Sequence, residues 1–260
     1  MDAGRLAALA AIAEAAADVA GAVIRPLFRA DIAAEIKGDA SPVTIADRAA
    51  EQAMRALLAE RTPQAGVMGE EFGLDRPGAG LRWVLDPIDG TRAFITGRPL
   101  FGTLIALLEE GEPVLGVIDQ PITGERWVGV AGERTRFRGP AGRVGTRRCA
   151  SLAAAELSCT SPEMLGDAAP SFARLAAAAR RVTWGGDCYG FGLLALGQID
   201  VIAERDLKLW DWAALGPVIE GAGGLLRDWS GRRLTAESAG DALAVGDPAL
   251  LEAAAACLAG

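Results

Sequence analysis

The stretch from Trp83 to Thr91 holds the residues most suited to chemistry. An apolar strand leads directly into Asp86 and Asp89, and Gly90 then opens a helix. Two desolvated carboxylates raise each other's pKa, so such a pair is best explained by divalent cations that neutralise it. The amides of Gly90 and Thr91 at a helix start would add an anion site beside the metals. The pattern predicts phosphoryl chemistry.

The competing interpretation of this stretch is an Asx-type turn with an aspartate N-cap. Other acidic motifs argue against it. Glu70 and Glu71 follow the short strand-like run Val67-Met68, where adjacent glutamates are hard to explain by packing. Asp211 follows Trp210 at a predicted helix start and could be a simple N-cap. Thr44 and Asp47 lie one turn apart on a predicted helix and, taken alone, would count as surface residues. Taken together, these motifs indicate a functional site more strongly than any one of them does alone.

The chain contains no histidine, which removes several mechanisms. Among its 260 residues, 34 acidic side chains face 26 basic ones, and the formal net charge is −8. Ser-His-Asp and Cys-His nucleophiles, a histidine general base and imidazole zinc sites are excluded. An acidic chain without basic runs or interleaved aromatic residues is a poor nucleic-acid binder, so no nucleic-acid partner is expected. A small phosphorylated substrate would need metal ions to neutralise the local field.

Cysteine usage and hydropathy indicate the compartment. The four cysteines show no Cys-x-x-Cys spacing, which favours a reducing cytoplasm. The apolar stretch Leu6 to Leu27 could be a signal peptide. However, Glu14 and Asp18 interrupt it and its apolar positions have helical spacing, which favours an amphipathic helix. We expect no transmembrane span, no membrane partner and a cytoplasmic protein.

The N-terminal half has the pattern of an α+β unit. A long helix is predicted over the first 36 residues and a second from Val43 to Arg61, after the boundary Ser41-Pro42. Short strand-like runs separated by turns then follow. They are Val67-Met68, Trp83 to Leu85, Thr103 to Leu108, Val114 to Ile118 and Arg126 to Val130. Two helices before such a meander predict an antiparallel sheet.

The C-terminal half alternates strands and helices, which is an α/β signature. The predicted strands are Leu157 to Cys159, Val182 to Trp184, Ile199 to Ala203, Gly224 to Leu226 and Leu243 to Val245. The predicted helices are Ser171 to Arg180, Asp187 to Leu196, Asp211 to Ala222 and Pro248 to Leu258. We expect one unit over residues 1–260, with an α+β metal-site half over 1–140 and an α/β half over 141–260.

A haloacid-dehalogenase-like phosphatase is a competing architecture, because those enzymes carry a nucleophile in an Asp-x-Asp-Gly-Thr run. Here two residues separate Asp86 from Asp89. In a regular strand, positions i and i+3 lie on opposite faces, which would lose the geometry of nucleophile and acid.

Three motifs together resemble the inositol monophosphatase superfamily of Mg²⁺-dependent, lithium-sensitive phosphatases. They are Gly69-Glu70-Glu71, then Asp86-Pro87-Ile88-Asp89-Gly90-Thr91, then Trp210-Asp211. The resemblance spans nearly the whole chain and implies the layered αβαβα sugar-phosphatase fold, usually as a homodimer.

The resemblance also implies roles for individual residues. Glu70, Asp86, the Ile88 carbonyl, Asp89 and Asp211 would bind two or three Mg²⁺ ions, which oxygen ligands alone can hold. Asp47 and Thr91 would activate the attacking water. The amides of Gly90 and Thr91 would hold phosphate.

Further runs resemble the histidinol-phosphatase branch of this superfamily: Gly69 to Gly73, Thr91 to Thr103, Gly185 to Tyr189 and Leu207 to Asp211. This implies hydrolysis of histidinol phosphate to histidinol and phosphate in histidine biosynthesis. Anionic Asp187 and Glu204 could border the leaving group and favour a cationic substrate, although an N-cap and a surface residue are the ordinary interpretations.

Four residues are predicted to bind substrate: Asp187, Glu204, Arg92 and Lys208. Lys37 is a further candidate, because Lys37 and Lys208 are the two lysines of the chain. An inositol-1-phosphate or 3′-phosphonucleotide phosphatase is the runner-up, and a non-catalytic metal or phosphoester sensor is the alternative from another class.

Overall fold

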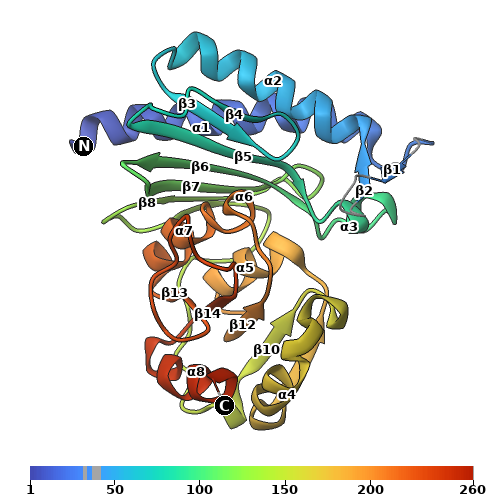
Figure 1. The fold of residues 1–260 in the computed structure, drawn as a ribbon, viewed down its shortest axis with the longest axis vertical. Coiled ribbons are helices and arrows are strands. Elements are labelled where there is room, and N and C mark those ends of the chain that lie inside the picture. The colour runs from blue at the N-terminus through green and yellow to red at the C-terminus, as the bar shows by residue number, and fades with distance from the viewer. Residues whose placement is uncertain (32–33, 37–41, 260) are drawn as a thin grey trace.

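The computed structural model describes residues 1–31, 34–36 and 42–259, and it shows five layers of alternating helices and sheets (Figure 1). Helices α1 (Ala3–Ile24) and α2 (Ile45–Arg61) form one outer layer. A seven-stranded sheet comes next, then a middle layer of helices, then a five-stranded sheet, and finally an outer layer with the C-terminal helix α8 (Leu251–Ala259). The αβαβα architecture expected from the sequence is confirmed.

Helix α1 ends earlier than the sequence analysis predicted. Asp2 caps it by accepting the Arg5 N–H, but the helix stops at Ile24 and a 3₁₀ turn, η1 (Arg25–Leu27), follows. The prediction of a helix over the first 36 residues was therefore wrong. Pro26 explains the stop, because it has no N–H to donate and its ring collides with the carbonyl four residues earlier.

Helix α1 also explains the apolar N-terminus. By length and composition, Ala3–Leu27 could cross a bilayer, and 44% of its most apolar window is buried within this fold. Its buried face packs against α2 and the strands β6 and β7. The core of the domain therefore accounts for this hydrophobicity.

The seven-stranded sheet carries most of the N-terminal half, in the order β4-β3-β5-β6-β7-β8-β9. All neighbours are antiparallel except β3 and β5. The strands are β3 (Gly66–Gly69), β4 (Gly73–Asp75), β5 (Leu81–Asp89), β6 (Gly102–Glu109), β7 (Glu112–Gln120), β8 (Glu125–Val130) and β9 (Arg136–Arg138). A short antiparallel pair, β1 (Ala34–Ile36) and β2 (Pro42–Thr44), precedes α2, and α3 (Thr91–Ile95) follows β5.

A β-bulge in β5 changes the expected strand geometry. Asp86 pairs with Leu104 and Asp89 with Gly102, so three residue steps on β5 oppose two on β6. The extra residue restores the alternation and puts Asp86 and Asp89 on the same face of the sheet. The strand thus continues through Asp89, whereas the sequence analysis ended it at Leu85 and placed i and i+3 on opposite faces.

The second sheet has the order β11-β10-β12-β14-β13, with β10 parallel to both neighbours and β14 antiparallel to both of its own. Its strands are β10 (Glu156–Cys159), β11 (Arg181–Trp184), β12 (Val201–Glu204), β13 (Leu225–Asp228) and β14 (Ala242–Val245). The outer helices are α4 (Ala169–Ala178) and α8 (Leu251–Ala259), and 3₁₀ turns occur at Leu152–Ala154, Pro162–Ala168 (η3) and Pro248–Leu250.

The middle layer joins the two sheets. It contains α5 (Asp187–Ala195), α6 (Leu209–Trp212) and α7 (Leu215–Ala222), and α7 packs on β7, β8 and β13. A single helix over Asp211 to Ala222 was predicted, but it is divided, because Pro217 cannot donate to the carbonyl four residues before it. The division of the chain into halves at residue 140 stays a prediction.

Candidate active site

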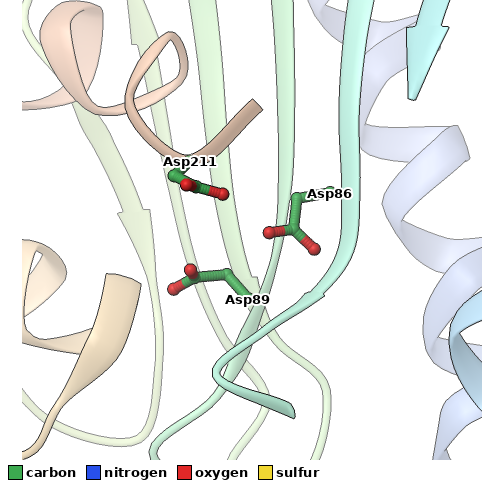
Figure 2. A group of neighbouring side chains, drawn as sticks. All are labelled: Asp86, Asp89 and Asp211. Atoms are coloured by element: carbon green, nitrogen blue, oxygen red, sulfur yellow. The ribbon is translucent and has the colours of Figure 1, made fainter. Parts of the chain in front are cut away.

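Three aspartates meet where β5 faces the middle layer. One carboxylate oxygen each from Asp86, Asp89 and Asp211 can be chosen so that all three lie within 4.8 Å of one another. Figure 2 shows the three side chains around one space, with Asp86 and Asp89 on β5 and Asp211 on the helix opposite. They line a pocket of about 310 Å³, called here the acidic pocket. The pocket is also lined by Glu70, Ile88, Gly90, Thr91, Thr160, Met164, Asp187, Glu204, Arg205, Asp206 and Leu207.

Each of the three aspartates accepts a hydrogen bond from a backbone N–H. Oδ1 of Asp86 accepts the Ile88 N–H at 3.0 Å, across the bulge. Oδ2 of Asp89 accepts the N–H of Cys188 on α5 at 2.5 Å. Oδ2 of Asp211 accepts the Lys208 N–H at 2.7 Å, so Asp211 is the third residue of α6 rather than its N-cap. In Asp89 and Asp211 one carboxylate oxygen is thus held by a backbone N–H.

Burial and mutual repulsion raise the pKa values of these carboxyl groups. Burial is the largest cause for all three, and it raises the pKa of Asp89 and of Asp211 to about 7. The pKa of Asp86 rises well above its usual range, first through burial and then through the charges of Glu70 and Asp89. A bound cation reverses this penalty, because it favours the charged forms. An oxygen-only donor set with raised pKa values therefore fits a hard divalent cation.

Glu70 reaches the acidic pocket from the turn between β3 and β4. Its N–H donates to the Leu85 carbonyl at 3.2 Å, next to the start of the Asp86 motif. Its negative charge raises the pKa of Asp86, Asp89 and Asp211. Glu70 is outside the tight group of three, but it faces the same space.

Asp47 contacts Thr91, which lines the acidic pocket. Thr44 caps α2, and both its N–H and its hydroxyl donate to Oδ2 of Asp47, at 2.8 and 2.6 Å. The Thr91 hydroxyl lies 3.4 Å from Oδ1 of Asp47 and 3.2 Å from the Ile88 carbonyl. Burial raises the pKa of Asp47, which makes this carboxylate a stronger base.

Gly90 allows the start of α3 to approach α5 closely. Its φ of 89° lies in the left-handed region, and a Cβ atom there would lie 2.8 Å from Cγ of Asp187. Only glycine fits both conditions, so residue 90 can begin α3 while Asp187 packs against it.

Asp187 and Glu204 form a second acidic group on the pocket wall. The Thr160 hydroxyl connects them: it donates to Oε1 of Glu204 at 2.7 Å and accepts the Asp187 N–H at 3.2 Å. Burial raises the pKa of Asp187 to about 7 and that of Glu204 to about 8. A positive charge beside these two carboxyl groups would favour their charged forms.

The basic residues predicted to bind substrate, Arg92 and Lys208, do not line the acidic pocket. Arg92 lies outside the acidic pocket, in an adjoining one that also contains Thr160 and Asp187, and its charge lowers the pKa of Asp187. Lys208 is exposed, and it reaches Asp211 through its backbone N–H. Lys37 lies outside the described residues.

The comparisons with known proteins agree with this geometry. The family model described as the inositol monophosphatase family matches residues 5–259. The chain belongs to this family. It is 46% identical over 238 residues to the bifunctional phosphatase IMPL2 of Arabidopsis thaliana, covering 90% of this chain and 68% of that protein. It is 39% identical over 229 residues to the histidinol-phosphatase of Mycobacterium tuberculosis, covering 85% of this chain and 87% of that one.

Among solved structures, an inositol monophosphatase from Zymomonas mobilis superposes with a TM-score of 0.90. It is 48% identical, and the match covers all of both chains. As a member of the inositol monophosphatase family, the chain is a phosphatase of small phosphorylated substrates, and its acidic cluster fits the metal dependence of that family.

The match to the inositol monophosphatase family also excludes a haloacid-dehalogenase-type site. The β5 bulge puts Asp86 and Asp89 on one face, so the opposite faces expected from strand alternation were wrong and do not exclude such a site. The conclusion holds through the family match instead.

Two contacts of this inositol monophosphatase site were missed by sequence reasoning. Thr160 joins the two acids of the wall, and Glu51 is a fully buried carboxylate beneath the Glu70 turn. Glu51 lies one turn after Asp47 on the same face of α2, but this spacing alone does not predict that it is buried.

Proposed function

We propose that this phosphatase is a Mg²⁺-dependent histidinol-phosphatase. Water attacks phosphorus in line with the ester oxygen, a new P–O bond forms, and the bond to the ester oxygen breaks. The leaving alkoxide takes a proton and becomes histidinol, and phosphate is the second product.

The acidic wall, formed by Asp187 and Glu204 in the acidic pocket, supports this substrate. Asp187 and Glu204 line the same pocket as Asp89 and are joined through Thr160. Histidinol phosphate carries an ammonium group and a titratable imidazole, so the two carboxylates would pair with positive charge on the leaving group. A neutral polyol would leave two buried carboxyl groups without a cation, which is unfavourable.

The ligands proposed for Mg²⁺ are the carboxylates of Glu70, Asp86, Asp89 and Asp211 and the Ile88 carbonyl, which offer only oxygen atoms. We propose two or three ions per site. When bound, Mg²⁺ supplies Lewis-acid activation of the phosphate and of water.

Asp47 and Thr91 are proposed to handle the proton of the attacking water. Donation by the Thr91 hydroxyl to Oδ1 of Asp47 leaves the Thr91 oxygen free to accept a hydrogen bond from water. The raised pKa of Asp47 allows it to receive that proton through Thr91. The amides of Gly90 and Thr91 are proposed to hold the phosphate oxygens.

A second candidate is an inositol-1-phosphate phosphatase. The 48% identity to the inositol monophosphatase of Zymomonas mobilis favours it, and the histidinol-phosphatases of Mycobacterium tuberculosis and of Chlorobaculum parvum, the latter 40% identical, favour the first. We favour the first candidate because the carboxyl groups of Asp187 and Glu204 would suit a cationic leaving group. A homodimer and a cytoplasmic location stay predictions.

The test is phosphate release by the purified protein with Mg²⁺ from three substrates: histidinol phosphate, inositol-1-phosphate and adenosine 3′,5′-bisphosphate. We expect the highest kcat/KM for histidinol phosphate. A clear preference for the polyol or the nucleotide would refute this substrate, and no turnover of any of them would favour a metal or phosphoester sensor.

A further inference from the structure

Glu51 is a buried carboxylate outside the acidic pocket. It lies on α2 one turn after Asp47, and its side chain is fully buried. Such a group persists in a core only when its oxygens are fully hydrogen-bonded. Its partners therefore indicate what it stabilises.

Two of the groups that donate to Glu51 belong to the turn that carries Glu70. Oε2 of Glu51 accepts the Glu71 N–H at 2.8 Å, and Oε1 accepts the Phe72 N–H at 3.3 Å. The turn approaches closely because residue 69 is glycine: a Cβ atom there would lie 1.9 Å from Oε1 of Glu51. The carboxylate thus sits directly against the backbone on both sides of Glu70.

Arg55 completes this arrangement from the next turn of α2. Its Nε donates to Oε1 of Glu51 at 2.7 Å, and its Nη2 donates to the Gly73 carbonyl at 2.5 Å. Arg55 therefore holds the carboxylate and the far end of the turn together. The fixed geometry of the guanidinium makes both bonds directional.

Helix α2 thus contacts two parts of the site. Asp47 contacts Thr91, and Glu51 contacts the turn of Glu70, with the two acids stacked at i and i+4 on α2. The N–H of Glu70 is held by Leu85 and the N–H of Glu71 by Glu51, so the Glu70 backbone is fixed on both sides.

We propose that Glu51, supported by Arg55, is a positioning residue that sets the direction of the Glu70 carboxylate and thereby the affinity for Mg²⁺. The proposal rests on the proposed metal site but not on the substrate. Residues that orient metal ligands typically change metal affinity by about 10- to 100-fold when they are replaced.

The test is calorimetric titration of Mg²⁺ into metal-free protein, without substrate, for the wild type, Glu51→Gln and Arg55→Lys. Glutamine turns an amide group toward one of the N–H donors, and lysine loses the bond to Gly73. We expect Kd for Mg²⁺ to rise by about 10-fold or more in Glu51→Gln and by a few-fold in Arg55→Lys. At saturating Mg²⁺, we expect kcat to return close to the wild-type value, while the Mg²⁺ concentration for half-maximal activity stays raised.

Glu60→Gln is the matched control, because Glu60 lies on the same helix but is exposed. It should bind Mg²⁺ with the wild-type Kd. Circular dichroism would show that each variant is folded, and if Glu51→Gln does not fold, Arg55→Lys and Glu51→Asp decide the question. Wild-type affinity in the folded variants would overturn the proposal. A wild type that binds no Mg²⁺ would refute the metal assignment as well, whereas a wrong substrate would change none of these titrations.

Discussion

The N–H of Cys188 donates a 2.5 Å hydrogen bond to Oδ2 of Asp89, although 99 residues separate them in the chain. Asp89 ends β5 in the first sheet, and Cys188 is the second residue of α5 in the middle layer. One oxygen of this carboxylate is thus held by the C-terminal half. Closure of α5 against the end of β5 therefore shapes the acidic pocket.

Gly90→Ala tests this closure. The left-handed backbone should cost about 1–2 kcal/mol of stability for any non-glycine residue. The added methyl would also press on Asp187, next to Cys188, so turnover and Mg²⁺ affinity should fall as well. Chemical denaturation, phosphate release and Mg²⁺ titration would measure the three effects.

Gly124→Ala is the control for Gly90→Ala. Gly124 has a φ of 75° but no atom within 4 Å of its added Cβ, so it should lose a similar stability and keep its activity. If both variants lost turnover equally, the closure argument would be wrong.

Thr91→Ala separates water activation from metal binding. Without the hydroxyl, the route from water to Asp47 is lost, so kcat should fall by roughly 10²- to 10⁴-fold, the usual contribution of general base catalysis. Mg²⁺ affinity should stay close to that of the wild type. Asp89→Asn, in contrast, should abolish turnover and weaken Mg²⁺ binding together. The prediction fails if Thr91→Ala binds Mg²⁺ as poorly as Asp89→Asn does.

Asp86 and Asp89 could be predicted as a metal pair from the sequence because both follow the end of an apolar strand. Asp211, which by itself could be a simple N-cap, joined them through the resemblance to the inositol monophosphatase superfamily. The common face of Asp86 and Asp89 could not be derived, because it depends on a bulge set by pairing with Gly102 on β6. Register between strands is a tertiary property, and alternation within β5 gave the opposite faces.

Glu51 shows a different limit of sequence reasoning. A glutamate four residues after a functional aspartate is most often a solvent-exposed helix residue. It is buried here because the turn from Gly69 to Gly73 folds over α2. Nothing local to α2 encodes that contact. Pro26, in contrast, was visible in the sequence and does end α1, although its effect was not used.

The stability of the metal-free protein should fall as pH rises. The pKa values of Asp89, Asp187 and Asp211 are about 7 and that of Glu204 is about 8, all raised above the unfolded values near 4. The folded state therefore holds protons that the unfolded state has released. The stabilisation is complete below about pH 4 and is lost as pH rises through about 7 to 8.

Thermal unfolding in EDTA at pH 5.5 and pH 8.5 checks this sign. We expect a lower Tm at pH 8.5, and saturating Mg²⁺ should restore it there because the ion binds the ionised carboxylates. The Asp187→Asn variant should show a smaller dependence on pH. A Tm in EDTA that rises between these pH values would contradict the prediction.

Asp187→Asn should reduce the preference for a cationic substrate. A hydrogen bond to a charged group contributes about 1.5–3 kcal/mol, so kcat/KM for histidinol phosphate should fall by roughly 10- to 100-fold. Inositol-1-phosphate offers no positive charge, so its kcat/KM should change far less. Glu252→Gln, an exposed acid on α8, should leave both values unchanged. Because the variant keeps the size of the side chain, an equal loss for both substrates would mean that Asp187 supports the Gly90 contact rather than substrate selection.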